Sequence, residues 1–199
     1  MEEIVVSTTA NLSQAARQQL GLYRYAVFVE QMQWNLPSIS TGTLEEWDEF
    51  DREDTINVIA YTSDRCICGY ARLLPTTRPY LLAKIFPDLC SIPLISDSST
   101  WELSRFTTFH HDGAINTQRM RRLLQIIFFH AEYLGFRYLI GVAPHSIERL
   151  YRRLGLVLRP LGPVQTRRDG LAAFSLQIDT AGLKALSSQS PNPSPAPHT

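Results

Sequence analysis

The sequence has few cysteines, no surplus of either charge and no internal repeat. Cys66, Cys68 and Cys90 make an odd count without C-x-x-C spacing, which argues against both a disulfide framework and a zinc site and predicts free thiols. Nineteen basic residues balance nineteen acidic ones, so no overall field favours nucleic acid or a membrane surface as a partner. Any charged partner must therefore be recognised by a local patch.

Long apolar runs are also absent. No stretch approaches the ~18 apolar residues of a membrane span, and the start Met1-Glu2-Glu3 lacks the basic and apolar regions of a secretory signal. We therefore expect a soluble, cytoplasmic protein. Its 199 residues, 44% of them hydrophobic, allow one core and predict a single domain over residues 1–186. Residues 187–199 contain four prolines and four serines without periodicity, which predicts a disordered tail.

Hydrophobic periodicity predicts the elements of this domain. In the first half we expect a strand at 4–7, a helix from Asn11 or Ser13 to Met32 with a possible break at Gly21, a loop at 34–54, a hairpin of 56–62 with 66–74, and a short helix at 80–86. In the second half we expect an irregular segment at 90–99, a strand at 100–107, a helix from Asn116 or Thr117 to Gly135, a strand at 138–143, a helix at 146–154, and strands at 156–159 and 172–178. Strands that alternate with helices from residue 100 onward indicate an α/β sandwich.

Several charged residues lie inside or beside the most apolar stretches. They are Arg24, Asp48, Asp51, Arg72, Glu102 and Arg105. Burying charge is unfavourable unless partners neutralise it, so these residues predict a functional site rather than an ordinary surface.

Five segments place these residues in a recognisable order. They are Arg24-Tyr25-Ala26-Val27-Phe28, Trp34, Glu46-Trp47-Asp48-Glu49-Phe50-Asp51, residues 68–76 (Cys-Gly-Tyr-Ala-Arg-Leu-Leu-Pro-Thr), and Trp101-Glu102-Leu103-Ser104-Arg105-Phe106. In order and spacing they resemble the acyl-homoserine-lactone synthase family of bacterial quorum sensing, from about residue 20 to residue 178. Five dispersed motifs are far more specific than one short pattern. The family's invariant positions fall on Arg24, Phe28, Trp34, Asp48, Asp51, Arg72, Phe86, Glu102 and Arg105.

The resemblance implies both a fold and a reaction. The fold is a three-layer α/β/α sandwich with a central mixed sheet, related to the N-acetyltransferases. The reaction joins S-adenosyl-L-methionine to an acyl group from acyl carrier protein, and it releases N-acyl-L-homoserine lactone, methylthioadenosine and free carrier. S-Adenosylmethionine is a substrate here, and neither a cofactor nor a metal is implied. The residues implied to be catalytic are Glu102, Arg24, Asp48, Asp51, Arg72 and Arg105.

The chemistry of S-adenosylmethionine suits these residue types. The predicted binding set is Arg24, Phe28, Trp34, Asp48, Arg105 and Phe106. Phe28 and Trp34 either face the sulfonium or adenine or pack in the core. Arg24 either grips the substrate carboxylate or braces Asp48 and Asp51 through paired hydrogen bonds. The two aspartates either orient the substrate and hold the loop over it, or belong to an exposed acidic loop.

Glu102 is the candidate general base. A carboxylate can take the proton of the substrate amine, directly or through water, if burial raises its pKa from ~4.3 towards neutrality. Its alternative role is a buried ion-pair partner of Arg105 or Arg72. Strict strand alternation puts Glu102 and Arg105 on opposite faces, so both reach one site only if a β-bulge lies between them. Amides freed by such a bulge would be able to donate to the thioester oxyanion.

The acyl chain is expected between the sheet and the helix at 117–134, where the same side chains are equally consistent with plain core. The predicted pocket set is Leu103, Ser104, Met120, Leu124, Ile140 and Gly141, with Phe106 beside it. Family members that prefer 3-oxo chains tend to carry Thr at the position of Gly141, so Gly141 favours an unsubstituted chain. The Ala-Arg-Leu-Leu-Pro-Thr signature at 71–76 favours a short to medium length, roughly four to eight carbons.

Two basic clusters are candidates for docking the acidic carrier protein, although such clusters alone are often solvated faces. They comprise Arg119, Arg121, Arg122, Arg149, Arg152 and Arg153. The alternative enzyme is an N-acetyltransferase that uses acetyl-coenzyme A, but neither 142–145 nor 112–115 supplies the Gly-rich turn that cradles pyrophosphate. A catalytically inactive ligand sensor on the same fold would be expected to lack some of the charged site residues, and all of them are present in this sequence. His110 and His111 are adjacent and favour a loop over a metal site.

Overall fold

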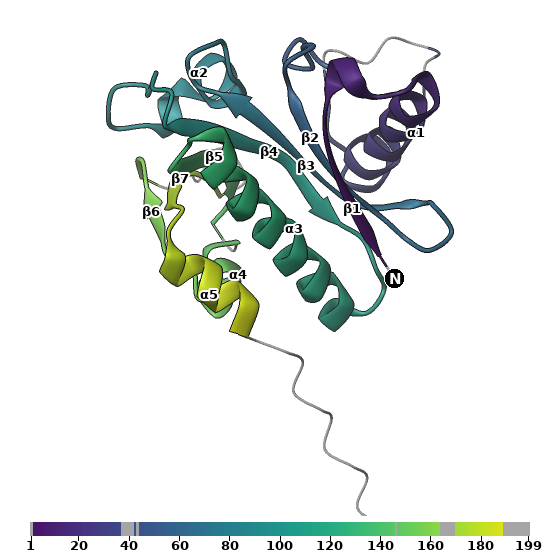
Figure 1. Ribbon diagram of the computed structural model, residues 1–199. Coiled ribbons are helices and arrows are strands. Elements are labelled where there is room, and N and C mark those ends of the chain that lie inside the picture. Colours follow the sequence, from purple (N-terminus) through teal and green to yellow (C-terminus); the bar gives the residue numbers. More distant parts are fainter. Residues whose placement is uncertain (1, 37–41, 43, 146, 164–169, 189–199) are drawn as a thin grey trace, which may run out of the picture.

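The computed structural model describes residues 2–36, 42, 44–145, 147–163 and 170–188. Its centre is a seven-stranded sheet (Figure 1). In spatial order the strands are β1 (Glu3–Thr8), β2 (Ile56–Tyr61), β3 (Ile67–Pro75), β4 (Thr100–Thr108), β5 (Tyr138–Pro144), β7 (Leu171–Gln177) and β6 (Leu158–Pro160). The pair β4 and β5 is parallel and the other pairs are antiparallel, so the sheet is mixed, as predicted.

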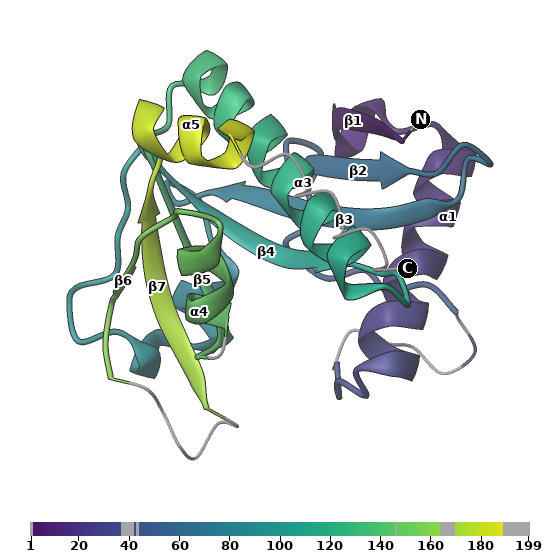
Figure 2. The ribbon, with the colours of Figure 1, turned by 90° about the horizontal axis from the view of Figure 1, so that it is seen from below.

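The sheet opens between β4 and β5. These two strands pair over three positions, from Thr100 opposite Tyr138 to Glu102 opposite Ile140. Figure 2 shows β4 then running away from β5 and β7. The predicted site strand therefore continues past Glu102 without its parallel neighbour.

Helices cover both faces of the sheet, which gives the predicted three layers (Figure 2). The long helix α3 (Gly113–Leu134) packs on Ala71 and Leu73, whereas Tyr70 and Leu74 of the same strand belong to clusters on the opposite face. That opposite face carries α1 (Gln14–Arg24), the π-helical segment η2 (Tyr25–Gln31) and α2 (Leu81–Ile85). The remaining helices are η1 (Thr9–Asn11), η3 (Pro87–Leu89), α4 (Ile147–Arg153) and α5 (Thr180–Ser188). No helix in the described ranges is both long and apolar enough to cross a membrane.

The first helix is continuous where a break at Gly21 was expected. Ser13 is its N-cap and accepts from the amide of Ala16 at 3.2 Å. The role of Gly21 is to leave room for the side chain of Trp47, because a Cβ at position 21 would lie 2.6 Å from Nε1 of Trp47. The change of geometry comes later, at Tyr25, where the π-helical turn begins.

The long helix begins earlier than predicted. Its N-cap is Asp112, whose carboxylate accepts from the amide of Ala114 at 2.7 Å. Asn116 and Thr117 do not cap the helix, because their side chains donate to the carbonyls of His110 and Gly113. The predicted end at Gly135 is confirmed by its left-handed φ of 79°.

The end of the domain differs most from expectation. The helix α5 was not predicted, and it includes Ser187 and Ser188, the first two residues of the expected tail. Asp179 accepts from the amide of Gly182 at 2.7 Å and so starts the helix. A Cβ at Gly182 would meet Phe128 of α3 at 2.9 Å, so the glycine allows α5 to pack closely. Residues 189–199 of the expected tail lie outside the described residues.

The middle of α3 belongs to the core, whereas the ends of α3 and β5 leave it. Leu123, Leu124, Ile127, Phe128 and Ala131 of α3 are buried. Leu134, at the end of α3, is 36% exposed, and Tyr138, at the start of β5, is 40% exposed. Both lie at the ends of their elements, where the neighbouring layer no longer covers them.

Candidate active site

The π-helical segment η2 brings one arginine and two aromatic residues together. Arg24 ends α1, and Phe28 lies one turn further on, in η2; both are buried. Trp34 stacks on Phe28 with the ring centroids 4.9 Å apart, and its amide donates to the carbonyl of Phe28. Trp34 is 43% exposed. This pair is therefore open to solvent on one side, as a binding surface needs, and π-helical turns are frequent at functional sites.

The acidic loop folds inward instead of facing solvent. Its side chains close a tight turn, since Asp51 accepts from the amide of Asp48 at 2.8 Å and Asp48 accepts from the amide of Phe50 at 2.9 Å. The side chains of Asp48 and Asp51 are 11% and 2% exposed, and Phe50 is buried beneath them. The reading as an exposed acidic loop is therefore wrong.

A β-bulge lies in β4 where the sequence required one. Tyr70 pairs with Thr107 and Arg72 pairs with Ser104, so Arg105 and Phe106 together face Ala71 on the neighbouring strand. Arg105 has a left-handed φ of 52°, which is uncommon for a residue with a Cβ. The bulge turns the side chain of Arg105 to the face that carries Arg72 and Ser104.

Three arginines and three carboxylates form a closed ring on this face. Around the ring the residues are Arg24, Glu46, Arg105, Asp48, Arg72 and Asp51, and we call this set the charge ring. Arginine and carboxylate alternate at every step, so the ring has no net charge. The arginine and carboxylate set is thus one network.

Arg24 and Arg72 supply two sides of the charge ring. Arg24 donates to Glu46 at 2.6 Å and holds Asp51 through two bonds of 2.7 and 3.0 Å. Arg72 holds Asp48 through two bonds of 2.6 and 3.0 Å, contacts Asp51 at 3.0 Å, and donates through Nε to Ser104 at 3.0 Å. Such paired bonds use the planar guanidinium in a way that lysine does not reproduce. Of the two roles left open for Arg24, its contacts fit bracing, but the acids that it braces are Asp51 and Glu46, while Asp48 is held by Arg72 and Arg105.

Arg105 closes the ring at the aromatic pair. Its Nη2 donates to Glu46 at 2.9 Å and to Asp48 at 3.0 Å. Its Cζ lies 5.3 Å from the ring centroid of Phe28 and 5.6 Å from that of Trp34, within the range of cation–π attraction. Arg105 is therefore the ring member beside the open aromatic surface, and its partner Asp48 has the most exposed side chain of the ring.

The charge ring keeps Asp51 and Glu46 ionised. Burial raises the pKa of Asp51, but Arg24 and Arg72 outweigh it and leave that pKa well below its usual value. Burial also raises the pKa of Glu46, and Arg24 and Arg105 bring it below its usual value. Replacing one partner of a buried ion pair leaves the other charge uncompensated, which destabilises a protein by ~3–5 kcal/mol. The ring is consequently a rigid element with no spare charge.

Glu102 lies outside the charge ring and caps a helix. Its two carboxylate oxygens accept from the amides of Leu81 and Leu82, each at 2.7 Å. These are the first amides of α2, and the side chain of its N-cap residue, Tyr80, makes no capping hydrogen bond to them. Within the described residues Glu102 pairs with neither Arg105 nor Arg72, so the expected ion-pair role is wrong. Burial raises the pKa of Glu102 to about 7, although the two amides and Arg72 lower it.

The predicted acyl set is divided between the two faces of the sheet. Leu103, Met120 and Leu124 pack on the α3 side. Ser104 binds Arg72, and Ile140 belongs to the cluster under α2. The prediction that these two residues line the acyl pocket is therefore wrong, because strand alternation points their side chains to the face opposite α3. Gly141, on β5, lies close to the backbone of β4, because a Cβ at this position would be 2.7 Å from the carbonyl oxygen of Leu103.

Phe106 also differs from its predicted place. It packs against the α3 side of the core, with its ring centroid 6.5 Å from that of Tyr151. The bulge sends Arg105 to one face and leaves Phe106 on the other, so Phe106 does not join Phe28 and Trp34. Phe106 was also predicted beside the acyl pocket that includes Leu103, and it lies on the same side of the sheet as Leu103.

The basic clusters are only partly accessible. Arg119 is buried, pairs with Glu2 at 2.7 Å and donates to the carbonyl of Phe109, so it is removed from the predicted dock. Arg122 is half-buried and also lies near Glu2, at 3.8 Å. Arg121 is half-buried, whereas Arg149, Arg152 and Arg153 on α4 are exposed. Arg152 pairs with Glu148 at 2.6 Å.

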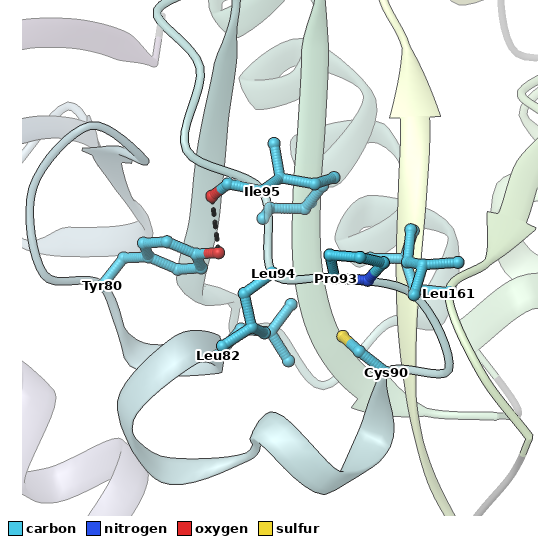
Figure 3. A pocket seen from close by; sticks show the side chains of 9 residues that line it. Tyr80, Leu82, Cys90, Pro93, Leu94, Ile95 and Leu161 are labelled. Atoms are coloured by element: carbon cyan, nitrogen blue, oxygen red, sulfur yellow. Dashed lines mark hydrogen bonds between the residues drawn. The ribbon is translucent and has the colours of Figure 1, made fainter.

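Two pockets lie apart from the charge ring. One is an apolar pocket beside the α2 helix that Glu102 caps, and the space in it is too tight for a water molecule. Figure 3 shows Leu82, Leu94 and Leu161 around it, with the hydroxyl of Tyr80 donating to the carbonyl of Ile95. The other, of about 350 Å³, lies between the end of α3, the segment 135–137 that follows it, and the start of α5. Within the described residues, no group of three or more His, Cys, Asp or Glu side chains is arranged to hold a metal ion.

Sequence reasoning missed Glu46 as a site residue. Its side chain is fully buried and bridges Arg24 and Arg105. No shortage of acids pointed to it, because Asp48, Asp51 and Glu102 already matched the three arginines in number. The run Glu45-Glu46-Trp47-Asp48-Glu49 gives no indication of which glutamate points inward.

Comparison with known proteins places this geometry in a family. The autoinducer synthase family model matches residues 8–186. An acyl-homoserine-lactone synthase of Pseudomonas aeruginosa is 38% identical over 176 residues, which cover 88% of this chain and 86% of that protein. A crystal structure of TofI in a ternary complex with an inhibitor and MTA superposes with a TM-score of 0.80 at 37% identity, covering 93% of this chain and 96% of TofI.

Two further structures bear on the acyl donor and on the fold. BjaI, a CoA-dependent acyl-homoserine lactone synthase seen with SAM and isopentyl-CoA, has a TM-score of 0.82 at 25% identity, covering 94% of this chain and 89% of BjaI. An acyl-CoA N-acyltransferase from Pseudomonas aeruginosa has a TM-score of 0.60 at 17% identity, with 88% of this chain and 99% of that one covered. The last likeness shows the fold alone, and it agrees with the predicted N-acetyltransferase-like sandwich.

Proposed function

Because this chain belongs to the autoinducer synthase family and is an acyl-homoserine-lactone synthase, an acyltransferase, we propose that its substrates are S-adenosyl-L-methionine and an acyl-[acyl carrier protein]. The products are then N-acyl-L-homoserine lactone, methylthioadenosine and free carrier. The proposal also places the reaction in the cytoplasm, where both substrates are made. The observation that carries it is the charge ring, whose two least buried members are Arg105, which adjoins the Phe28–Trp34 pair, and Asp48, which contacts Arg105.

This arrangement fits the amino-acid end of S-adenosylmethionine. The carboxylate binds the Arg105 guanidinium, and the ammonium binds Asp48. The sulfonium lies against the Trp34 and Phe28 rings, where a desolvated cation gains ~2 kcal/mol. Because the ring has no net charge, it binds a zwitterion without leaving an unpaired charge in the site.

Glu102 is the proposed general base for the amine. With a pKa of about 7, Glu102 is ionised in about half of the molecules at neutral pH, so the carboxylate is able to accept a proton. Each of its oxygens accepts one amide of α2 and keeps a second acceptor position. The side chain is buried, so the proton travels to it through one water. The neutral amine then attacks the thioester carbonyl, and the carrier leaves as a thiol.

The bulge offers a place for the oxyanion of this step. Arg105 and Phe106 share one partner position on β3, so one of their amides lies outside the regular ladder. We assign the thioester oxyanion to that amide. In the second step the amide product folds so that its carboxylate attacks the carbon bonded to sulfur, which closes the lactone and expels methylthioadenosine. Arg105 holds the carboxylate for this attack, and the step depends chiefly on positioning.

The acyl chain is proposed to lie on the α3 side of the open end of the sheet. Leu103, Phe106 and Leu124 provide apolar surface there, and Met120 packs beside them. Gly141 offers no hydroxyl for a 3-oxo group, which supports an unsubstituted chain of roughly four to eight carbons. Ser104 and Ile140 are not part of this proposed slot.

The choice of donor rests on the N-terminus of α3. In a coenzyme A enzyme this position offers free amides to pyrophosphate. Here the carboxylate of Asp112 occupies it by accepting from Ala114, and its negative charge opposes phosphate. This supports a carrier-bound donor. A second candidate, acyl-coenzyme A as donor, has its support from the CoA-dependent relative BjaI.

The test is product analysis with matched donors. Purified protein is incubated with S-adenosylmethionine and with acyl carrier proteins or coenzyme A esters of the same acyl chains, and products are identified by mass spectrometry. We expect lactone and methylthioadenosine, formed faster from the carrier-bound donor. Faster turnover of the coenzyme A esters would select the second candidate, and no lactone from any donor would overturn the proposal.

A further inference from the structure

Glu46 is fixed in the charge ring by its backbone as well as by its side chain. Its amide donates to the carbonyl of Gly21 in α1 at 3.0 Å, and its side chain is fully buried. Gly21 makes this contact possible, because a Cβ there would lie 2.6 Å from Nε1 of Trp47 and 2.9 Å from Oε2 of Glu45. The backbone of Glu46 is thus held against a helix, and the carboxylate it carries is fixed in place.

Arg105 lies between two competing acids. Glu46 contacts it twice, through Nη2 at 2.9 Å and Nε at 3.3 Å, while Asp48 contacts it once, through Nη2 at 3.0 Å. The contacts to Glu46 fix the plane of the guanidinium, since they engage two of its nitrogens. Within the described residues, Nη1 of Arg105 donates no hydrogen bond, so Glu46 determines the direction in which that free donor points.

We propose that Glu46 is a positioning residue for this synthase. It holds the Arg105 guanidinium so that Nη1 faces the carboxylate of S-adenosylmethionine, and it leaves Asp48 available to the substrate ammonium. This inference rests on the proposed function, because it concerns the same substrate. It adds a residue whose side chain touches no substrate atom and acts through Arg105.

Loss of the Glu46 charge has a defined consequence. Arg24 keeps its two bonds to Asp51, so one side of the ring survives. Arg105 loses its main partner and turns further to Asp48, which it already contacts at 3.0 Å. The two substrate-facing groups then engage each other more fully. Binding of S-adenosylmethionine weakens, while the acyl donor, which meets the other side of the sheet, is unaffected.

The test compares Glu46→Gln with Glu49→Gln. Glu49 lies three residues along the same loop but is exposed and pairs with Lys84 on the surface. We expect Glu46→Gln to raise KM for S-adenosylmethionine roughly 10–100-fold, the range for loss of an orienting partner, with KM for the acyl donor changed less than about twofold. Glu49→Gln should leave both constants unchanged.

Gly21→Ala provides a second variant with every charge intact. Alanine favours the helix, so α1 should persist, while the added Cβ displaces the segment that carries Glu46. We expect the same selective rise in KM for S-adenosylmethionine, at a reduced size. Equal rises in both KM values, or a lower unfolding temperature with unchanged KM values, would overturn the positioning role. Absence of lactone from the unsubstituted protein would instead overturn the proposed function.

Discussion

The two faces of the central sheet are built on different principles. On the α3 face, residues such as Leu73, Leu123 and Leu139 fill a continuous apolar core. On the opposite face the same sheet carries Arg72 into the charge ring, Ser104 beside Arg72, and Glu102 under α2. Hydrophobic packing tolerates a loss at one position by partial collapse, whereas a closed ring of charges depends on every member. The α3 face therefore supplies stability, and the opposite face supplies a fixed geometry for chemistry.

Breaking the charge ring should have the largest effect on the fold. Asp51→Asn leaves Arg24 and Arg72 without their shared acid, and we expect a loss of ~3–5 kcal/mol in the free energy of unfolding. Urea denaturation at pH 7 measures this. Lys84→Ala, which breaks a surface pair with Glu49, is the control and should change stability by less than ~1 kcal/mol. Equal effects of the two substitutions would show that the ring is not a stabilising unit.

A core substitution on the α3 face should separate stability from substrate binding. Leu123→Ala removes a fully buried side chain, and we expect a loss of ~2–5 kcal/mol. The folded fraction should keep its KM for S-adenosylmethionine, because the sheet lies between this residue and the charge ring. Denaturation combined with steady-state kinetics below the unfolding temperature checks this. A raised KM would mean that the two faces are coupled.

Much of this contrast was predictable from the sequence, and the missing parts have physical reasons. The positions of Glu102 and Arg105 required a bulge, because a strand alternates its side chains, and the bulge is present at Arg105. The role of Glu46 was missed because it depends on the contact of its loop with Gly21, twenty-five residues earlier. Ser104 and Ile140 were assigned to the wrong face because residue type alone does not distinguish the two faces of a sheet covered on both sides.

The pH dependence of the protein should reveal Glu102. Its pKa is raised by burial to about 7, so the folded state holds this proton more tightly than the unfolded state, in which the pKa is ~4.3. The stability from this group is complete below ~pH 4 and is lost as the pH rises through 7, by at most ~4 kcal/mol. Glu102→Gln should remove this loss, so thermal unfolding of the variant should depend less on pH between 5 and 8. Parallel pH profiles of the two proteins would contradict the raised pKa.

Catalytic activity should also depend on the ionisation of Glu102, but it should increase as the pH rises, whereas the stability decreases. The base must be ionised, so kcat/KM of the unsubstituted protein should increase as the pH rises through about 7. Glu102→Gln should lower kcat by ~100-fold or more and abolish this rise. Wild-type turnover in the variant would remove Glu102 from the role of base and leave it as the cap of α2.

The smallest effect is expected at the outer surface of α4. Arg152 is exposed and pairs only with Glu148 among the described residues. Charge reversal of Arg152 together with Arg121 should raise KM for acyl carrier protein several-fold through loss of electrostatic complementarity, without changing KM for S-adenosylmethionine. The effect should decrease at high salt. An unchanged KM for the carrier would remove α4 from the dock.

The most direct test of the account is calorimetric binding of two ligands to the unsubstituted protein and to Arg105→Lys. S-Adenosylmethionine has the amino-acid end that Arg105 and Asp48 are proposed to bind, and methylthioadenosine lacks it. We predict that Arg105→Lys weakens S-adenosylmethionine at least ~10-fold, because lysine does not reproduce the planar guanidinium, and leaves the affinity for methylthioadenosine unchanged. An equal loss for both ligands, or no loss for either, would contradict the claim that the charge ring holds Arg105 for the substrate carboxylate.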